Sequence, residues 1–132
     1  MKLFSFIIFV FITTSCMNNH SNSEVNPGPE TCDCNKLILD NSYNRFYLKD
    51  KKKPFTGTCQ IIYPGGKIKT ERHFVEGKYH GDLIDYYPNG KIESITQYET
   101  HFINGFQKIY SESGELLHHY VFKRSQLIET IK

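Results

Sequence analysis

Tryptophan is absent from the sequence, methionine occurs only twice, and no apolar run is long enough to cross a membrane. The longest such run, residues 3–12, has about half of the roughly 20 residues that a transmembrane helix needs. A patch of one charge is also lacking: 16 Lys and Arg balance 14 Asp and Glu, and Lys51–Lys53 is the longest basic run. A nucleic-acid partner is therefore not expected, because binding phosphates requires a concentrated basic surface.

Recognisable catalytic motifs are missing as well. The sequence has no Gly-x-Ser-x-Gly elbow and no His-Glu-x-x-His pair. The segment 64–67 is no phosphate loop, because Ile61 stands where the first glycine is required. His118 and His119 are adjacent on an expected strand, so they point to opposite faces and cannot chelate one metal together. We therefore expect no enzyme, no catalytic residues, no cofactor and no metal site.

The first residues have the pattern of an export signal. Lys2 precedes the apolar run, and small residues then lead to Cys16. This order is typical of a secretory signal peptide. The segment also resembles a bacterial lipobox, which implies that residues 1–15 are a lipoprotein signal peptide and that Cys16 is acylated with fatty acids such as palmitate, anchoring the protein to a membrane. The alternative is ordinary cleavage of a secreted protein, which leaves Cys16 as a thiol or in a disulfide.

Residues 16–35 are expected to form a flexible tether. The stretch is polar and contains Pro27 and Pro29, so it cannot bury enough apolar surface to order itself. Such a tether would hold a lipid-anchored domain away from its membrane. The stretch carries no acidic cluster, and we expect the protein in the bacterial cell envelope, at the outer membrane and facing the periplasm.

Three further cysteines follow the expected tether or lie at its end. Cys32 and Cys34 lack the two-residue spacer of a thioredoxin motif, and no second pair completes a zinc site. In an exported protein we expect one disulfide, Cys34 to Cys59 or Cys32 to Cys59. Closing a loop of about 25 residues would add about 3 kcal/mol in the chain-entropy model. In a reducing compartment the three would instead remain thiols.

A pattern with a period of 24 residues begins at Gly57 and recurs at Gly81 and Gly105. Each copy holds a second glycine and then an aromatic residue at fixed distances. These positions are Gly66, Gly90 and Gly114 for the glycines, and Phe74, Tyr98 and Phe122 for the aromatics. The copies run near residues 57–80, 81–104 and 105–128, within a repeat domain at 36–132. Fixed periods of this length indicate repeated supersecondary units.

Each copy is predicted to be a β-hairpin. Asn89-Gly90 favours a two-residue type I′ turn, in which both central residues have positive φ. This turn makes positions that sum to 179 face each other, so Tyr87 would oppose Ile92 and Gly81 would oppose Tyr98. The same register places Gly57 opposite Phe74 and Gly105 opposite Phe122. An aromatic ring over a strand glycine stabilises a sheet. The fold class expected is all-β, a single-layer antiparallel meander of about seven to eight strands.

The predicted register gives the sheet two different faces. One face carries the aromatic residues opposite the glycines and is expected to include Ile68, Ile92 and Leu116. The other face mixes apolar and charged residues. Its members Ile84, Tyr86, Phe106 and Tyr110 form a hypothetical protein-binding surface, because tyrosine combines rigid contact area with a polar end. Plain cross-strand packing is the alternative role of each tyrosine.

The segment Tyr-Pro-Asn-Gly-Lys-Ile at 87–92, followed by an aromatic residue, a turn and a glycine, resembles the MORN-variant repeat (the second MORN type) of bacterial exported proteins. Such proteins are often labelled members of a YwqK-like antitoxin family. The resemblance covers about residues 45–123 and implies a non-catalytic protein-binding module, antitoxin-like or immunity-like. The alternatives are a structural envelope lipoprotein without a dedicated partner and a repeat domain that binds lipid.

Overall fold

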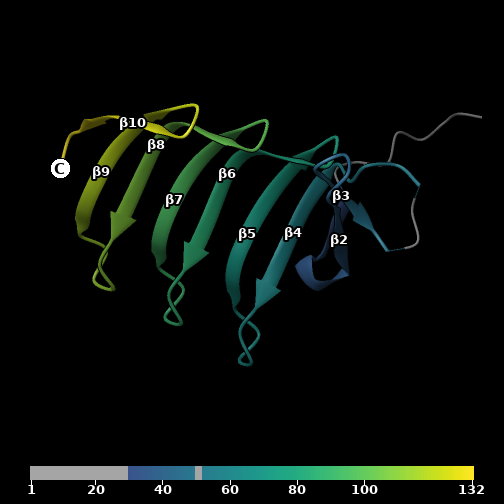
Figure 1. Ribbon diagram of the computed structural model, residues 1–132. Helices are drawn as coiled ribbons and strands as arrows, with labels where there is room; N and C mark the ends of the chain where they lie inside the picture. The colour runs from purple at the N-terminus through teal and green to yellow at the C-terminus, as the bar shows by residue number, and fades with distance from the viewer. Residues whose placement is uncertain (1–29, 50–51) are drawn as a thin grey trace, which may run out of the picture.

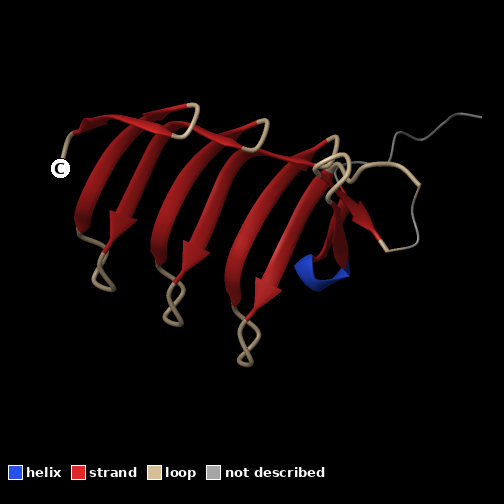
Figure 2. Ribbon diagram, in the orientation of Figure 1, coloured by secondary structure: helices blue, strands red, loops and turns tan. Residues whose placement is uncertain are grey.

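The computed structural model describes residues 30–49 and 52–132, so the expected signal peptide, Cys16 and most of the expected tether lie outside it. Within these residues there are ten strands, one 3-10 turn and no α-helix (Figure 2). Eight strands form one sheet in the order β1-β4-β5-β6-β7-β8-β9-β10, and β2 and β3 pair separately. Figure 1 shows β4 to β9 side by side as one curved sheet. The predicted all-β meander is confirmed.

The elements have the following bounds. They are β1 (Glu30–Asp33), the 3-10 turn η1 (Cys34–Lys36), β2 (Leu37–Asp40), β3 (Arg45–Leu48), β4 (Gly57–Ile62), β5 (Ile68–Val75), β6 (Lys78–Tyr86), β7 (Ile92–Glu99), β8 (Phe102–Tyr110), β9 (Leu116–Lys123) and β10 (Gln126–Thr130). From β4 onward every pair of neighbouring strands is antiparallel and sequential. The repeats therefore form a chain of hairpins in which each strand contacts its sequence neighbours.

The hairpin turn of the second repeat differs from the predicted two-residue type I′ turn. The Gly90 amide donates to the Tyr87 carbonyl at 2.8 Å, and the Tyr87 amide donates to the Lys91 carbonyl at 2.8 Å. Gly90 has φ of 89°, whereas Asn89 is not among the residues with positive φ. The loop thus has three residues, a type I turn followed by a left-handed glycine. Pro88 favours this outcome because its fixed φ suits the first central position of a type I turn.

A β-bulge follows this longer turn and restores the predicted register. Tyr86 pairs with Ile92, and Asp85 pairs with Ser94, so Glu93 has no partner of its own. The predicted pairing of Tyr87 with Ile92 was therefore wrong by one residue. Beyond the bulge, the strands return to positions that sum to 179, and Gly81 pairs with Tyr98.

The other two hairpins repeat this arrangement. Ile62 pairs with Ile68 and Tyr110 with Leu116, each next to a bulge. Directly opposite residues share one face of a sheet, so the bulge moves the residue after each turn to the other face. Placing Ile68, Ile92 and Leu116 on the face of the aromatic residues was wrong for this reason. The pairs Gly57 with Phe74 and Gly105 with Phe122 are present as predicted.

Two-residue turns with positive φ at both positions lie at the opposite ends of the strands, where they join one hairpin to the next strand. They are Glu76–Gly77 (φ 51° and 74°), Thr100–His101 (52° and 73°) and Arg124–Ser125 (49° and 64°). Non-glycine residues rarely adopt this conformation, and a β-branched residue such as Thr100 is especially disfavoured. Backbone hydrogen bonds to the preceding copy of the repeat hold the second and third of these turns. The His101 amide donates to the Tyr79 carbonyl at 3.0 Å, and the Ser125 amide donates to the Ile103 carbonyl at 2.8 Å.

Tyrosine hydroxyls connect successive repeats at the three-residue turns. The Tyr63 hydroxyl donates to the Tyr86 carbonyl at 2.8 Å, and the Tyr87 hydroxyl makes the same contact with the Tyr110 carbonyl. The third copy has Ser111 at this position. A serine side chain is too short to reach a following repeat, so its presence there is consistent with a terminal copy.

The hydrophobic core lies at the N-terminal end of the sheet. Phe55, Cys59 and Phe74 are buried, with 3%, 1% and 2% of their surfaces exposed. The β2–β3 hairpin, which the sequence did not reveal, supplies Phe46, whose ring lies 5.2 Å from the Phe74 ring and 5.3 Å from the Tyr79 ring. The Phe46 amide also donates to the Gly77 carbonyl at 2.8 Å. The hairpin therefore caps one face of the first repeat.

His101 fastens this cap to the second repeat. Its Nε2 lies 2.8 Å from the Asn44 carbonyl, and its Nδ1 lies 3.3 Å from the Tyr79 amide. These contacts fit a neutral ring, in which Nε2–H donates and Nδ1 accepts. The ring also packs edge-on against Tyr79 at 5.4 Å. One side chain at a turn thus joins the cap to the repeat array.

Ordered structure begins earlier than the expected domain start at residue 36. Strand β1, within the range expected to be tether, pairs in parallel with β4 over four residues. A disulfide joins Cys34 to Cys59. The last residues of the expected tether, 30–35, are therefore part of the folded domain.

Candidate functional site

The four residues of the hypothetical binding surface lie on one face of the sheet. Ile84 and Tyr86 stand on β6, and Phe106 and Tyr110 stand on β8. Between them, Ile95 pairs with Ile84 on one side and with Lys108 on the other. Residues at alternate positions of a strand share a face, so all four project to the same side. We call this side the open face, and the side that carries Phe74, Tyr79 and Tyr98 the packed face.

The open face is more apolar than the sequence suggested, because the bulges add three residues to it. These are Ile68, Ile92 and Leu116. Other large apolar residues on this face remain exposed: Ile62 by 48%, Val75 by 46% and Phe102 by 44%. Exposed apolar residues that gather in one area mark interaction surfaces more often than isolated ones do.

A polar network crosses the open face near the first repeat. The Gln60 amide Nε2 donates to Glu71 at 2.8 Å, and His73 Nε2 lies 3.6 Å from the other Glu71 oxygen. His73 Nδ1 lies 2.7 Å from the Asp82 carbonyl, across the irregular pairing of β5 and β6. These contacts fix the His73 ring on the surface, where its edge and the Glu71 carboxylate are accessible to a partner.

Burial raises the pKa of the Tyr86 hydroxyl above its ordinary value, and the nearby Glu71 carboxylate raises it further. Both effects disfavour the phenolate, because burial and a neighbouring negative charge each penalise an anion. The Tyr86 hydroxyl consequently keeps its proton at neutral pH. It can donate a hydrogen bond from a surface that is otherwise largely apolar.

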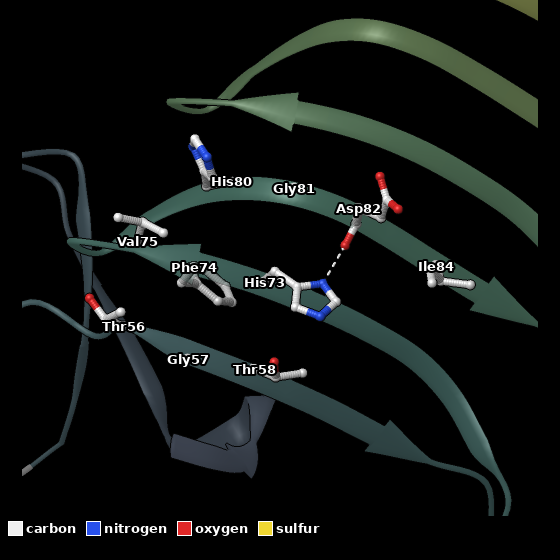
Figure 3. Close-up of a pocket in the computed structure, with 10 residues that line it drawn as sticks. All are labelled: Thr56, Gly57, Thr58, His73, Phe74, Val75, His80, Gly81, Asp82 and Ile84. Atoms are coloured by element: carbon white, nitrogen blue, oxygen red, sulfur yellow. Dashed lines mark hydrogen bonds between the residues drawn. The ribbon is translucent and has the colours of Figure 1, made fainter. Parts of the chain in front are cut away.

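A hollow of about 430 Å³ opens where β5 and β6 bend apart. Figure 3 shows His73 and Val75 from β5 and His80 and Asp82 from β6 around it, with Ile84 at one end. The bend coincides with Gly81, whose φ is 85°. At this position β6 contributes three residues opposite the single residue His73. Since Ile84 lines the hollow, it is continuous with the open face and large enough for an apolar side chain of a partner.

The C-terminal half of the open face combines aromatic and basic groups. The Lys108 ammonium lies 4.9 Å from the centre of the Phe106 ring. The His119 ring packs edge-on against the same ring at 6.5 Å. An ammonium over an aromatic face is attracted electrostatically, so these contacts orient Phe106 as a rigid apolar surface with basic groups beside it.

On the packed face, the Asp85 carboxylate has a structural role. Asp85 accepts a hydrogen bond from the Thr70 hydroxyl at 2.8 Å and another from the Ser94 hydroxyl at 3.2 Å. Thr70 is only 4% exposed. Both oxygens of Asp85 thus accept hydrogen bonds from hydroxyl groups of adjacent strands, so this carboxylate links β5, β6 and β7. Within residues 30–49 and 52–132, no group of three His, Cys, Asp or Glu side chains is placed to hold a metal ion.

Several residues that the sequence analysis singled out do not belong to the open face. The paired glycines and aromatics stabilise the hairpins, and Cys34 and Cys59 form the disulfide beneath the cap. Cys16 lies outside the described residues. Sequence reasoning missed the role of His101. Its position after Thr100, in the slot that Gly77 occupies one repeat earlier, was the available signal.

Comparison with known proteins identifies one repeat. Residues 79–100 match the family described as MORN repeat variant. This segment covers β7 and most of β6, together with the turn between them. No curated protein and no solved structure matches the chain. The chain therefore carries a MORN-variant repeat and is a β-repeat module.

The part of the chain that the structure describes contains no helix that is long and apolar enough to span a membrane.

Proposed function

We propose that this protein is a lipoprotein of the bacterial envelope, anchored through Cys16, whose repeat domain binds another protein through the open face. The observation that supports this proposal is the gathering of apolar and tyrosine side chains from all three repeats on a face that the β2–β3 hairpin does not cap. Tyrosines and aliphatic residues surrounded by polar groups are the usual composition of a protein-binding surface.

Two features make the open face suitable for a protein partner. The sheet is a rigid support, because its strands pair over long antiparallel registers and the repeats are joined through Tyr63 and Tyr87. The face also offers both polar and apolar contacts, with the Tyr86 hydroxyl beside Glu71 and the hollow beside Ile84. A preorganised surface loses little conformational entropy on binding, which favours affinity.

Site-specific photo-crosslinking in the native cell tests the binding face. A photoreactive residue replaces Tyr86 or Phe106, and Tyr43, which is 71% exposed on the cap, provides the matched aromatic control. We expect one discrete protein adduct at Tyr86 and Phe106 and none at Tyr43. Identical adduct patterns at the three positions, or no adduct at any, would contradict the proposal.

The purified partner then allows a quantitative measurement. Tyr86→Ser should weaken its binding by about tenfold or more, because central aromatic residues carry most of the energy of an interface. Tyr43→Ser should leave the affinity within about twofold. Equal effects of the two substitutions would place the contact elsewhere.

The anchor requires a separate measurement. Mass spectrometry of the native protein should detect acyl chains on Cys16 and no residues before it. Cys16→Ser should release the protein from the membrane fraction, since two or three acyl chains are needed for stable attachment. A native protein that carries Cys16 as a thiol, or that stays on the membrane after the substitution, would refute lipid anchoring.

The narrower form of the proposal makes the protein antitoxin-like, with a toxin as its partner. It is supported only by the resemblance of the repeats to antitoxin-labelled proteins, and a fold by itself does not fix a function. Expression of neighbouring open reading frames, with and without this protein, tests it. A frame that arrests growth and is neutralised by this protein would support the narrower form, and harmless neighbours would refute it.

A further inference from the structure

The C-terminal half of the open face carries charge of one sign. Strands β8 and β9 and the turn after β9 contain three cations, Lys108, Lys123 and Arg124, and no aspartate or glutamate. In the part of the chain that the structure describes, none of the three cations lies within ion-pair distance of a carboxylate. Lys108 lies two residues after Phe106 on β8, and Lys123 lies two residues after Val121, which pairs with Phe106. Both lysines therefore share the face of Phe106.

Two phenylalanines of β8 lie among the three cations. The Lys108 ammonium is 4.9 Å from the centre of the Phe106 ring, and the Arg124 guanidinium is 5.4 Å from the centre of the Phe102 ring. The Arg124 amide also donates to the side-chain oxygen of Asn104 at 3.3 Å, which fixes the turn beside Phe102. Ring and cation attract each other. This half of the face therefore presents apolar rings and positive charges that have no carboxylate partner.

We propose that the partner of the open face lays an extended, acidic protein segment along β8, with apolar side chains against Phe102 and Phe106 and carboxylates beside the three cations. This inference rests on the proposed function, because it specifies the partner that the open face binds. Complementary charge gives an interface its specificity and speeds association. An extended strand rises about 3.3 Å per residue, so a segment of about six or seven residues would cover β8 from Phe102 to Lys108.

The other half of the face favours a protein segment over a continuous anionic surface. Glu71 pairs with Ile84, Asp82 lies two residues before Ile84 on β6, and Glu99 pairs with Phe102. Carboxylates therefore stand among the lysines of β5 to β7 on this same face. An anionic lipid bilayer or a nucleic-acid backbone laid on the sheet would meet these carboxylates as well as the cations. A protein segment can place its own carboxylates opposite the cations alone.

Peptide selection tests the charge of the partner segment. A random peptide library displayed on phage is selected on the full chain, purified in detergent. A parallel selection uses the charge variant, which combines Lys108→Gln, Lys123→Gln and Arg124→Gln. We expect peptides retained by the wild type alone to be enriched in Asp and Glu together with apolar residues. Retention of no peptide, or of peptides without acidic enrichment, would overturn the inference. The composition of the peptides that the wild type retains decides this point even where the variant folds poorly.

An acidic peptide from the selection then gives an affinity by fluorescence anisotropy. The charge variant should bind it about tenfold more weakly, because each exposed ion pair contributes a factor of about two to three. A control variant combines Lys36→Gln, Lys49→Gln and Lys53→Gln, which removes the same charge from exposed positions near the β2–β3 hairpin (Figure 1). It should bind within about twofold of the wild type. Equal weakening in the two variants would overturn the inference.

Competition separates a protein segment from other anions. Mixed micelles that contain phosphatidylglycerol or phosphatidylcholine, and a single-stranded oligonucleotide, are added in turn to the complex of the full chain with the acidic peptide. We expect none of them to displace the peptide. Displacement by phosphatidylglycerol but not by phosphatidylcholine would assign the three cations to a lipid surface. Displacement by the oligonucleotide would assign them to a nucleic acid, and either result would overturn the inference.

The inference and the proposed function fail on different results. A protein adduct at Phe106 in the cell, together with selected peptides that lack acidic enrichment, would leave the proposed function standing and overturn the inference. Acidic peptides that depend on the three cations, without an adduct at Tyr86 or Phe106, would support the charge preference and contradict the proposed function.

Discussion

Replacing the first glycine of each repeat by alanine, one at a time, tests why glycine recurs at this position. Gly57, Gly81 and Gly105 occupy equivalent positions of the 24-residue period, and their φ angles are 150°, 85° and 116°. Their surroundings differ. A Cβ atom at Gly57 would overlap the Glu30 carbonyl oxygen of β1, whereas one at Gly81 would meet only the His73 Cβ at 3.8 Å.

The expected losses of unfolding free energy follow from these surroundings. Gly81→Ala should cost about 1–2 kcal/mol, the strain of holding a residue with a Cβ at positive φ. Gly57→Ala should cost more, about 3 kcal/mol, because the overlap is with backbone and the four residue pairs between β1 and β4 must separate.

Gly105→Ala should lie near the lower value, although its Cβ would also overlap a neighbour. That neighbour is the end of the Gln97 side chain, which can rotate away. The added cost is the lost contact, a few tenths of a kcal/mol. The loss of stability should therefore be larger at Gly57, where the added Cβ overlaps backbone, than at Gly105, where it overlaps a side chain. The two positions are equivalent in the repeat pattern.

Urea unfolding followed by far-ultraviolet circular dichroism measures these free energies. Gly65→Ala is the control, since its φ is not positive and no atom lies within 4 Å of the added Cβ. It should change stability by less than about 0.5 kcal/mol or raise it slightly. Equal losses at Gly57 and Gly81, or a loss at Gly65 as large as either, would refute this account of the glycines.

Three further predictions concern the core, the disulfide and pH. Phe74→Ala should cost about 3–5 kcal/mol because the ring is 2% exposed, whereas Phe102→Ala, at 44% exposure, should cost less than about 1 kcal/mol; urea midpoints compare them. Cys59→Ala should lower stability by about 3 kcal/mol under oxidising conditions but far less with reductant present. Burial raises the pKa of Tyr98, so its contribution to stability is complete below about pH 10 and is lost as pH rises through the higher pKa of the folded protein. Stability measured from neutral to strongly alkaline pH should fall less steeply in Tyr98→Phe, and a fall equal to that of the wild type would contradict this assignment.

The sequence pattern predicted the repeat and the glycine–aromatic pairs, but not the path between them. The pairing of Gly81 with Tyr98 follows from positions that sum to 179, and it is correct although the turn that motivated it is not. The three-residue turn shifts the register by one residue, and the bulge at Glu93 shifts it back. Pro88 was the signal for the type I turn, because Asn-Gly alone is compatible with either geometry.

The candidate binding face was predictable in part. Alternation along β6 and β8 is undisturbed between Ile84 and Tyr86 and between Phe106 and Tyr110, so their common side could be read from the sequence. The contributions of the residues after each turn could not, because the three-residue turn moves the residue that follows it to the other face before the bulge restores the predicted alternation. The hollow beside Ile84 depends on how β5 and β6 separate at Gly81, a feature of strand pairing rather than of residue type.

Hairpins with a 24-residue period could be predicted from the amino-acid sequence, because turn residues and alternating apolar residues are local signals that repeat at fixed spacing. The sequence alone does not show which cysteines share a bond, that the β2–β3 hairpin caps the sheet, or that His101 holds this cap. These contacts join segments far apart in the chain. Sequence spacing carries no information about such contacts until the strands are placed in space.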